Sequence, residues 1–293
     1  MFLAKSFKGA IRLPLSSLTI KRNLTLNAEL QASLDKLPDI GVIVIGGGHA
    51  GCEAATGSAR SGAPTTLITP FLNKIGTCSC NPSMGGVGKG TLLREVDALD
   101  GVASRVTDLA GIQFKMLNQS RGPAVWGPRA QIDREIYLKE MQNVLFDYPN
   151  LSLLEGKVKD LIVDTQQGEL DPHDRSYGSV KGVILDNDRI LKASKIVITT
   201  GTFLSGEIHI GMKTFPAGRY GEDPTYGISN TLNDAGFKLG RLKTGTPARL
   251  DGNTIDTTHL EKQFGDNPPH PMSYLNEKVA IEDQILCYGT HTT

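Results

Sequence analysis

Three glycines between Asp39 and Gly62 have the spacing of a phosphate-binding turn. Gly46, Gly48 and Gly51 follow the pattern G-x-G-x-x-G. In such a turn the first glycine permits the change of direction, the second leaves room for a pyrophosphate, and the third lets a helix pack closely on a strand. The helix N-terminus then attracts the phosphates. The pattern predicts a dinucleotide site, and a glycine-rich turn without a ligand is the alternative.

The segments beside this turn support a dinucleotide site. Residues 40–45 are apolar and rich in β-branched side chains, which is typical of a strand buried in a parallel sheet. Residues 50–60 are compatible with a helix that Gly62 can end. Residues 65–69 predict a second strand, but no carboxylate follows it to bind an adenosine ribose. That leaves a ribose contact through Thr69 or a backbone group.

The next segments predict a long loop and a helix. Residues 73–90 are rich in Gly, Pro and Ser and contain Cys78 and Cys80, and loops of this length are usually functional or disordered. The glycines around Lys89 do not have the P-loop spacing, so we reject a nucleoside triphosphatase. Residues 91–100 predict a helix with one apolar stripe, formed by Leu92, Leu93, Val96 and Leu99.

Two segments carry clustered cations. Residues 120–134 place three arginines, Arg121, Arg129 and Arg134, around Trp126, and two prolines predict an irregular path until a helix begins near Gln131. Arginine beside an exposed aromatic ring suits RNA, whereas a solvated turn with a core tryptophan is the alternative. Residues 241–249 carry Arg241, Lys243 and Arg249, which suit phosphate or plain solvation.

The remaining strands complete the expected α/β pattern. They are predicted at residues 151–154, 158–163, 180–185 and 195–200. The last of them ends in Thr200-Gly201-Thr202-Phe203. Ligands of doubly wound folds bind at this carboxyl edge of the sheet.

Composition limits the classes of function. The 31 basic and 31 acidic residues balance, so nucleic-acid binding would need a local patch. No apolar run approaches the length of a membrane span, and four cysteines without CxxC spacing argue against a structural zinc site. The basic, acid-free start before Glu29 predicts a mitochondrial transit peptide over residues 1–37, with a disordered basic tail as the alternative.

Long sequence blocks resemble one family. The blocks IGGGHAGCEAA, SCNPSMGGVGKGTLLREVDALDG, AGIQFKMLNQSRGPAVWGPRAQIDR, TGTFLSGEIHIG and GRLKTGTPARLD resemble the MnmG (GidA) family of FAD-dependent tRNA uridine 5-carboxymethylaminomethyl modification enzymes, and the leader suggests its mitochondrial branch. The resemblance implies an α/β fold with a Rossmann-like FAD-binding domain of the two-dinucleotide-binding flavoprotein type over residues 38–228, and the start of an inserted nicotinamide-binding α/β domain over residues 229–293.

The resemblance also implies site residues and roles. The FAD positions match Gly46, Gly47, Gly48, His49, Ala50, Gly51, Val158 and Thr225, and the two functional cysteines match Cys80 and Cys287. For tRNA phosphates we expect Arg121, Arg129, Arg241 and Lys243. The implied reaction joins a methylene group from methylene-tetrahydrofolate and an amine to C5 of wobble uridine 34, with FAD as redox carrier and NADH as its reductant.

Partners and completeness follow from the same resemblance. Members of the family work with a GTPase partner of the MnmE family, and we expect a homodimer at full length in the mitochondrial matrix. Family chains are roughly twice as long, so we expect a fragment that binds FAD weakly, aggregates and does not modify tRNA alone. The rival hypotheses are a flavin oxidoreductase acting on a small molecule and a non-catalytic dinucleotide-binding fragment.

Overall fold

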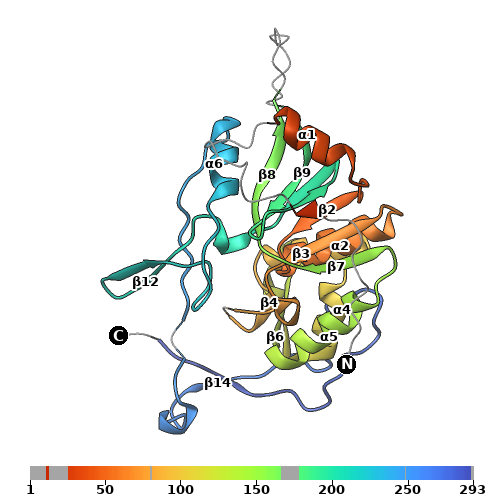
Figure 1. Ribbon diagram of the computed structural model, residues 1–293. Coiled ribbons are helices and arrows are strands. Elements are labelled where there is room, and N and C mark those ends of the chain that lie inside the picture. The colour runs from red at the N-terminus through yellow and green to blue at the C-terminus, as the bar shows by residue number, and fades with distance from the viewer. Residues whose placement is uncertain (1–10, 13–25, 80, 166–177, 248, 292–293) are drawn as a thin grey trace. The chain divides into compact units, whose positions relative to one another are not determined.

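A computed structural model describes residues 11–12, 26–79, 81–165, 178–247 and 249–291 (Figure 1). Packing divides the chain into two units. The first consists of Met1–Ile75 and Asp147–Leu242, and the second of Gly76–Phe146 and Lys243–Thr293. The domain ranges expected from the resemblance divide the chain differently, at residues 37 and 228, and they stay a prediction.

A four-stranded parallel sheet carries the glycine turn in the first unit. Its strands are β2 (Val42–Ile45), β3 (Thr65–Thr69), β7 (Leu151–Glu155) and β11 (Lys195–Ile198), in the order β11-β2-β3-β7. Helix α2 (His49–Arg60) connects β2 to β3 and buries its small residues, among them Gly51, Ala55 and Ala59. All residues of β2 and β3 are buried, as expected for the centre of a parallel sheet. The strand order is that of a Rossmann half, which confirms the predicted α/β fold.

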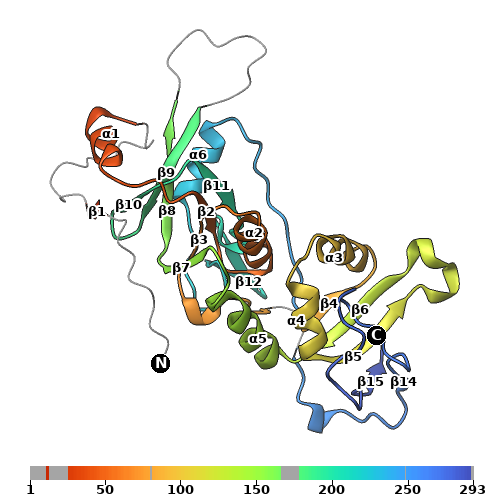
Figure 2. The same ribbon diagram turned by 90° about the vertical axis from the view of Figure 1, so that its right-hand side faces the viewer.

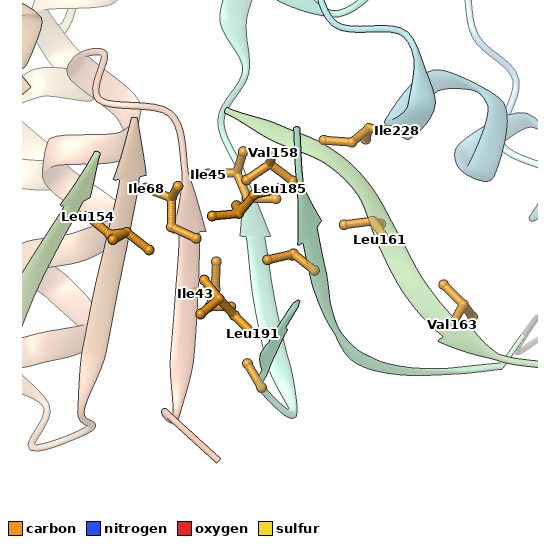
Figure 3. Packing of buried hydrophobic residues seen from close by; sticks show 12 residues of the cluster. Ile43, Ile45, Ile68, Leu154, Val158, Leu161, Val163, Leu185, Leu191 and Ile228 are labelled. Atoms are coloured by element: carbon orange, nitrogen blue, oxygen red, sulfur yellow. The ribbon is translucent and has the colours of Figure 1, made fainter. Parts of the chain in front are cut away.

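An antiparallel sheet packs beside the parallel one. It contains β1 (Ile11–Arg12), β10 (Arg189–Lys192), β9 (Ser179–Leu185) and β8 (Val158–Asp164), in that order. Figure 3 shows the apolar core between the two sheets, where Ile45 lies beside Val158 and Leu185, and Ile43 lies beside Leu191. Helix α6 (Gly227–Asp234) adds Ile228 to this core.

Helix α1 (Ala28–Asp35) lies on the antiparallel sheet in Figure 1. Asn27 caps it, because its side chain accepts a 2.7 Å hydrogen bond from the Leu30 amide. Leu30 and Leu34 are buried against Ile162 and Ile190. The range 1–37 expected for the leader therefore includes a packed helix.

Short elements complete the first unit. They are the 3-10 turns η1 (Leu72–Lys74) and η4 (Gly201–Phe203), and a hairpin of β12 (Glu207–Ile210) and β13 (Lys213–Pro216). Turn η1 directly follows β3, and η4 follows β11. Both turns therefore lie at the carboxyl edge of the parallel sheet.

The second unit contains a three-stranded antiparallel sheet and three helices (Figure 2). The sheet has the order β4 (Ser83–Gly85), β6 (Gly127–Ile132), β5 (Gly111–Leu117). The helices are α3 (Lys89–Ala98), α4 (Ala103–Ala110) and α5 (Arg134–Phe146). The remaining elements are the 3-10 turns η2 (Gln119–Arg121), η3 (Pro123–Val125) and η5 (Gly252–Thr254), and the paired strands β14 (Glu261–Gln263) and β15 (Cys287–Gly289).

The sequence predicted an irregular path up to a helix that begins near Gln131, and both parts of this prediction are wrong. Residues 127–132 form strand β6, and the helix begins at Arg134 and not near Gln131. Pro128 is tolerated in this strand because the pairing with β4 stops one residue away, at Arg129.

The apolar stripe predicted for α3 is only partly buried, since Leu93 and Val96 are half-buried. Leu92 and Leu99 are 61% and 75% exposed, and the buried positions are Gly90 and Asp97. A Cβ atom on Gly90 would lie 2.4 Å from the Pro128 carbonyl oxygen. Close packing on β6, which apolar periodicity does not signal, therefore decides which side of α3 is buried.

Candidate functional site

The glycine turn between β2 and α2 contains three positions with different surroundings. Gly46 has φ 108°, and a Cβ atom there would lie 2.5 Å from the Thr199 carbonyl oxygen. A Cβ atom on Gly51 would lie 1.7 Å from the Gly46 carbonyl oxygen. A Cβ atom on Gly48 would meet nothing within 4 Å. The first and third glycines are therefore required by the protein itself, whereas the second borders open space.

Helix α2 starts at the edge of that space. Gly48 is its N-cap residue, and no side chain in the described part of the chain caps it. His49 and Ala50 form the first turn, where amide groups point out of the helix end. These amides and the helix dipole favour an anion. The arrangement fits the pyrophosphate of a dinucleotide such as FAD.

Thr199, at the end of β11, fixes the turn from the neighbouring strand. Its hydroxyl donates to the carbonyl oxygens of Ile45 at 2.7 Å and Gly46 at 3.2 Å. Sequence reasoning pointed to the turn at residues 200–203 and missed Thr199. The signal was present, because a hydroxyl residue ends the strand that runs beside β2.

The carboxyl end of β3 carries no acid of its own. Thr69 is buried, and its hydroxyl oxygen would lie 3.0 Å from a Cβ atom on Gly47. The carboxylate near this point comes from β7, where Glu155 pairs in register with Thr69. Its Oε2 accepts a 3.1 Å hydrogen bond from the Leu72 amide. Sequence reasoning did not include Glu155 among the site residues.

The other expected cofactor positions present mainly backbone. Val158 is 5% exposed and its side chain lies in the core, so only its main chain is available to a ligand. Thr225 is half-buried, and its amide donates to the Phe203 carbonyl oxygen at 2.8 Å. Its carbonyl oxygen accepts from the Ser205 amide at 2.8 Å. Thr225 thus joins the segment that follows η4.

A family model for glucose inhibited division protein A matches residues 41–293. The chain belongs to the GidA family. The resemblance stated from the sequence blocks is thereby confirmed.

Relatives of this GidA-family chain include proteins named as tRNA-modifying enzymes. One from Pongo abelii, "5-taurinomethyluridine-[tRNA] synthase subunit MTO1, mitochondrial", is 47% identical over 98% of this chain and 41% of its own length. One from Granulibacter bethesdensis, "tRNA uridine 5-carboxymethylaminomethyl modification enzyme MnmG", is 51% identical over 86% of this chain and 38% of its own length. The chain therefore spans about two fifths of these relatives.

A solved GidA structure from Aquifex aeolicus has the same fold. It is 42% identical, with a TM-score of 0.76, and the match covers 85% of this chain and 40% of that one. In the part of the chain that the model describes, no helix is long and apolar enough to cross a membrane. The same residues contain no cluster of His, Cys, Asp and Glu that could hold a metal ion.

Of the two expected functional cysteines, Cys287 lies among the described residues. Cys80 lies outside the described residues. Cys287 is half-buried in β15 and pairs with Gln263 of β14. Cys78, which has no role in the expected chemistry, is buried, and its thiol donates to the Asn81 carbonyl oxygen.

Polar side chains hold the segment before Cys287 on the free edge of β5. Gln113 Nε2 donates to the carbonyl oxygens of Gln263 and Ile285, both at 2.9 Å. The Phe114 amide donates to Gln284 Oε1 at 2.7 Å, and the Met116 amide donates to Asp266 Oδ2 at 2.6 Å. These bonds satisfy edge groups of β5 that a further strand would otherwise pair with. They also position β14 and β15, which Figure 2 shows near β5.

Two buried carboxylates anchor the same segment to the helices. Asp108 of α4 is 1% exposed and accepts from the Met272 and Ser273 amides at 2.6 and 3.0 Å, and from the Asn276 side chain at 2.8 Å. Burial raises the pKa of Asp108 above its usual value, although these hydrogen bonds oppose the rise. Asp97 of α3 accepts from the Tyr274 amide at 2.7 Å.

The expected tRNA-binding residues belong to both units of the chain. Arg121 and Arg129 lie on the β5–β6 hairpin of the second unit, where Lys115 and Arg129 are direct cross-strand partners. Arg241 belongs to the first unit, where it donates to the Ser205 carbonyl oxygen at 2.7 Å and pairs with Glu207 at 3.5 Å. Lys243 is exposed in the second unit.

Trp126, at the tip of this hairpin, is 39% exposed. Its indole N–H donates to the Gln119 carbonyl oxygen at 3.1 Å, which fixes the ring at the surface. The ring is thus not a fully buried core residue. Part of it is available for stacking.

Proposed function

We propose that this GidA-family chain forms part of an FAD-dependent enzyme that modifies C5 of wobble uridine 34 in tRNA. The observation that carries the proposal is the open space at Gly48, at the N-terminus of α2, in a chain whose relatives are named as tRNA uridine modification enzymes. A side chain would fill that space without touching the protein. A glycine there is best explained by a ligand.

The residues of the first unit have separate tasks toward FAD. Gly46 to Gly51 hold the pyrophosphate through backbone amides and the dipole of α2. Val158, through its main chain, and Thr225, on the segment that joins η4, would supply further contacts to FAD. FAD, when bound, supplies the redox chemistry of the one-carbon unit. NADH as its reductant and methylene-tetrahydrofolate as the carbon donor are supported by the family resemblance.

Cys80 and Cys287 are the proposed groups that act on the base. C5 of uracil becomes nucleophilic when a thiolate adds to C6, and the thiolate leaves again after C5 has reacted. One of the two cysteines adds to C6 or moves the proton at C5. Cys287 suits either role because its sulfur is half-buried on a strand that polar side chains of β5 hold in place.

The β5–β6 hairpin is the proposed contact with the tRNA backbone. Like charges at directly opposed positions, as in Lys115 and Arg129, repel each other, and a phosphate bound beside them would reduce that repulsion. Arg121 and the exposed part of Trp126 lie on the same hairpin. Phosphate pairing and base stacking are the two interactions that single-stranded RNA loops require.

Partners and location complete the proposal. We place the protein in the mitochondrial matrix, because relatives that cover almost the whole chain are named as mitochondrial. A GTPase of the MnmE family, a homodimer and the use of taurine or glycine as the amine are supported by the family resemblance.

The test has two steps. The purified full-length protein should show flavin absorbance, and with the GTPase partner, tRNA, methylene-tetrahydrofolate and glycine or taurine it should produce a modified uridine that nucleoside mass spectrometry detects at position 34. Bound flavin with oxidation of a small molecule and no change in tRNA would favour the rival oxidoreductase. Absence of flavin would contradict the cofactor assignment.

A further inference from the structure

We propose that Glu155 supplies the carboxylate that holds the adenosine ribose of FAD, in place of the acid that usually ends the second strand of such a fold. The inference rests on the proposed binding of FAD. No carboxylate stands at the end of β3, where such folds usually have one. Strand β3 ends in Thr69, and Pro70 and Phe71 follow without a polar side-chain group. A ribose at this edge therefore needs a partner from another element.

Strand register places Glu155 beside the end of β3. β3 and β7 are parallel, and Thr69 and Glu155 are direct partners. Side chains of paired residues in neighbouring parallel strands point to the same face of the sheet. The face that Thr69 occupies is the one toward the glycine turn, because its hydroxyl lies close to Gly47. The Glu155 side chain therefore starts on the face where the cofactor would lie.

A hydrogen bond shows where the carboxylate ends. Glu155 Oε2 accepts from the Leu72 amide at 3.1 Å, so the side chain extends from β7 to the chain that leaves β3. The usual acid would present its carboxylate in this position. A carboxylate has about four acceptor positions, so the bond to Leu72 leaves capacity for both ribose hydroxyls. Glu155 is also exposed to solvent, so a ligand can reach it.

The surrounding backbone brings a second expected FAD position close to Glu155. The Gly156 amide donates to the Thr69 carbonyl oxygen at 2.9 Å, which ties the exit of β7 to the end of β3. Val158, one of the expected FAD positions, begins β8 three residues after Glu155. One short connection thus carries a group for the ribose and a main-chain group for the neighbouring part of the cofactor.

A purely structural role is the competing explanation, since the bond to Leu72 also stabilises η1. The two roles separate when the ribose itself is changed. Binding to the full-length protein is measured by quenching of flavin fluorescence, with FAD and with an FAD analogue whose adenosine lacks both ribose hydroxyls. Hydrogen bonds to a charged group predict about 10- to 100-fold weaker binding of the analogue to the unmodified protein.

Glu155→Ala should reduce FAD affinity to that of the analogue and should weaken the analogue no further. Glu155→Gln keeps an acceptor for the Leu72 amide and should lose less affinity for FAD. The control is Asp147→Ala, which removes an exposed carboxylate ahead of the amino end of β7 and should change nothing.

Equal loss of affinity for FAD and analogue in Glu155→Ala would show that Glu155 acts through η1 alone. Unchanged FAD affinity in that variant would also overturn the assignment, and would leave the proposed cofactor standing. No flavin binding by the unmodified protein would overturn both.

Discussion

At the scale of single residues, the three glycines of the turn are needed for different reasons: two by the packing of the protein itself and one by the proposed ligand. Gly46 and Gly51 face backbone oxygens at distances that no Cβ atom tolerates, whereas Gly48 faces open space with an ordinary φ of −77°. A side chain at Gly48 costs the fold little. It would occupy the volume that a pyrophosphate needs.

In the full-length protein, Gly48→Val should therefore fold and should lose FAD. The expected result is an unchanged circular dichroism spectrum and thermal midpoint, with no flavin retained after gel filtration. Gly57→Ala, on the same helix with its nearest neighbour at 3.6 Å, is the control and should keep its flavin. Full flavin occupancy in Gly48→Val would contradict the site.

Gly51→Val should instead lower the unfolding free energy by about 1–3 kcal/mol or more, because it overpacks a buried contact.

Much of the first unit could be predicted from its residues. The glycine spacing, the apolar run before it and the β-branched run at residues 65–69 each reflect local chemistry, and β2, α2 and β3 lie where these patterns indicated. Glu155 was missed because its place at the site depends on strand register. A residue near the end of a strand 86 positions later has no local signal that links it to Thr69.

At the scale of elements, the segment that leads to β15 depends on a few polar side chains. Asp108 and Asp97 hold residues 272–276 on α4 and α3, and Gln113 holds the two ends of the paired strands on β5. The sequence does not reveal these bonds, since each joins residues more than a hundred positions apart. Strand β6 was missed for a different reason, because Pro123 and Pro128 predicted an irregular path for this segment.

Asp108 should make stability depend on pH in a definite direction. Its pKa is raised in the folded state by burial, so the folded protein holds this proton more tightly than the unfolded chain. The contribution is present below the unfolded pKa of about 3.8 and is lost as pH rises through the higher folded pKa. The unfolding free energy of the wild type minus that of Asp108→Asn should therefore fall as the pH rises above about 3.8 in urea titrations. A difference that rises with pH would contradict the buried-carboxylate explanation.

Gln113→Leu should release Cys287 from its position. Loss of both amide bonds leaves the Gln263 and Ile285 carbonyl oxygens without this donor, and the segment opens more often. Alkylation of the Cys287 peptide, followed by mass spectrometry, should become several-fold faster. Asn143→Ala, an exposed change on α5, serves as the control and should leave the rate unchanged. An equal rate in the Gln113 variant would mean that other contacts position the strand.

At the scale of the whole molecule, the distribution of charge governs tRNA binding, and the exposed edge of the parallel sheet governs aggregation. The net charge is zero, so attraction to tRNA must come from local cations. The parallel sheet has β11 as one edge, and no strand in the described part of the chain pairs with its outer side. Val197 of this strand is 38% exposed.

Charge removal at Arg121 and Arg129 should weaken tRNA binding and reduce its salt dependence. Each lost phosphate contact should lower the slope of log affinity against log salt by about 0.7 to 0.9. Arg241→Gln should have a smaller effect, because Glu207 already pairs with that guanidinium. Filter binding at several salt concentrations measures the slope, with Lys139→Gln of α5 as a charge-matched control. An unchanged slope in the double variant would mean that these arginines are only solvated.

The 293-residue chain alone should aggregate through β11. An unpaired edge strand that is mainly apolar can pair with another copy, and a lysine at Val197, in addition to Lys195, should disfavour that pairing. Val197→Lys should lower the aggregated fraction in sedimentation velocity, whereas Ile136→Lys, which changes an exposed apolar residue on helix α5, should not. Equal aggregation in both variants would locate the association elsewhere.

The edge of β5 also sets an order of events during synthesis. The residues that satisfy it, Asp266 and Gln284, follow their partners Met116 and Phe114 by 150 and 170 positions. At about 5–20 residues per second, a ribosome releases β5 roughly 10 to 30 s before those residues exist. The glycine turn needs only Thr199 to be complete, so the first unit can acquire its fold earlier. A nascent chain thus carries an unsatisfied strand edge for much of its translation, and this interval is when a chaperone would protect it most.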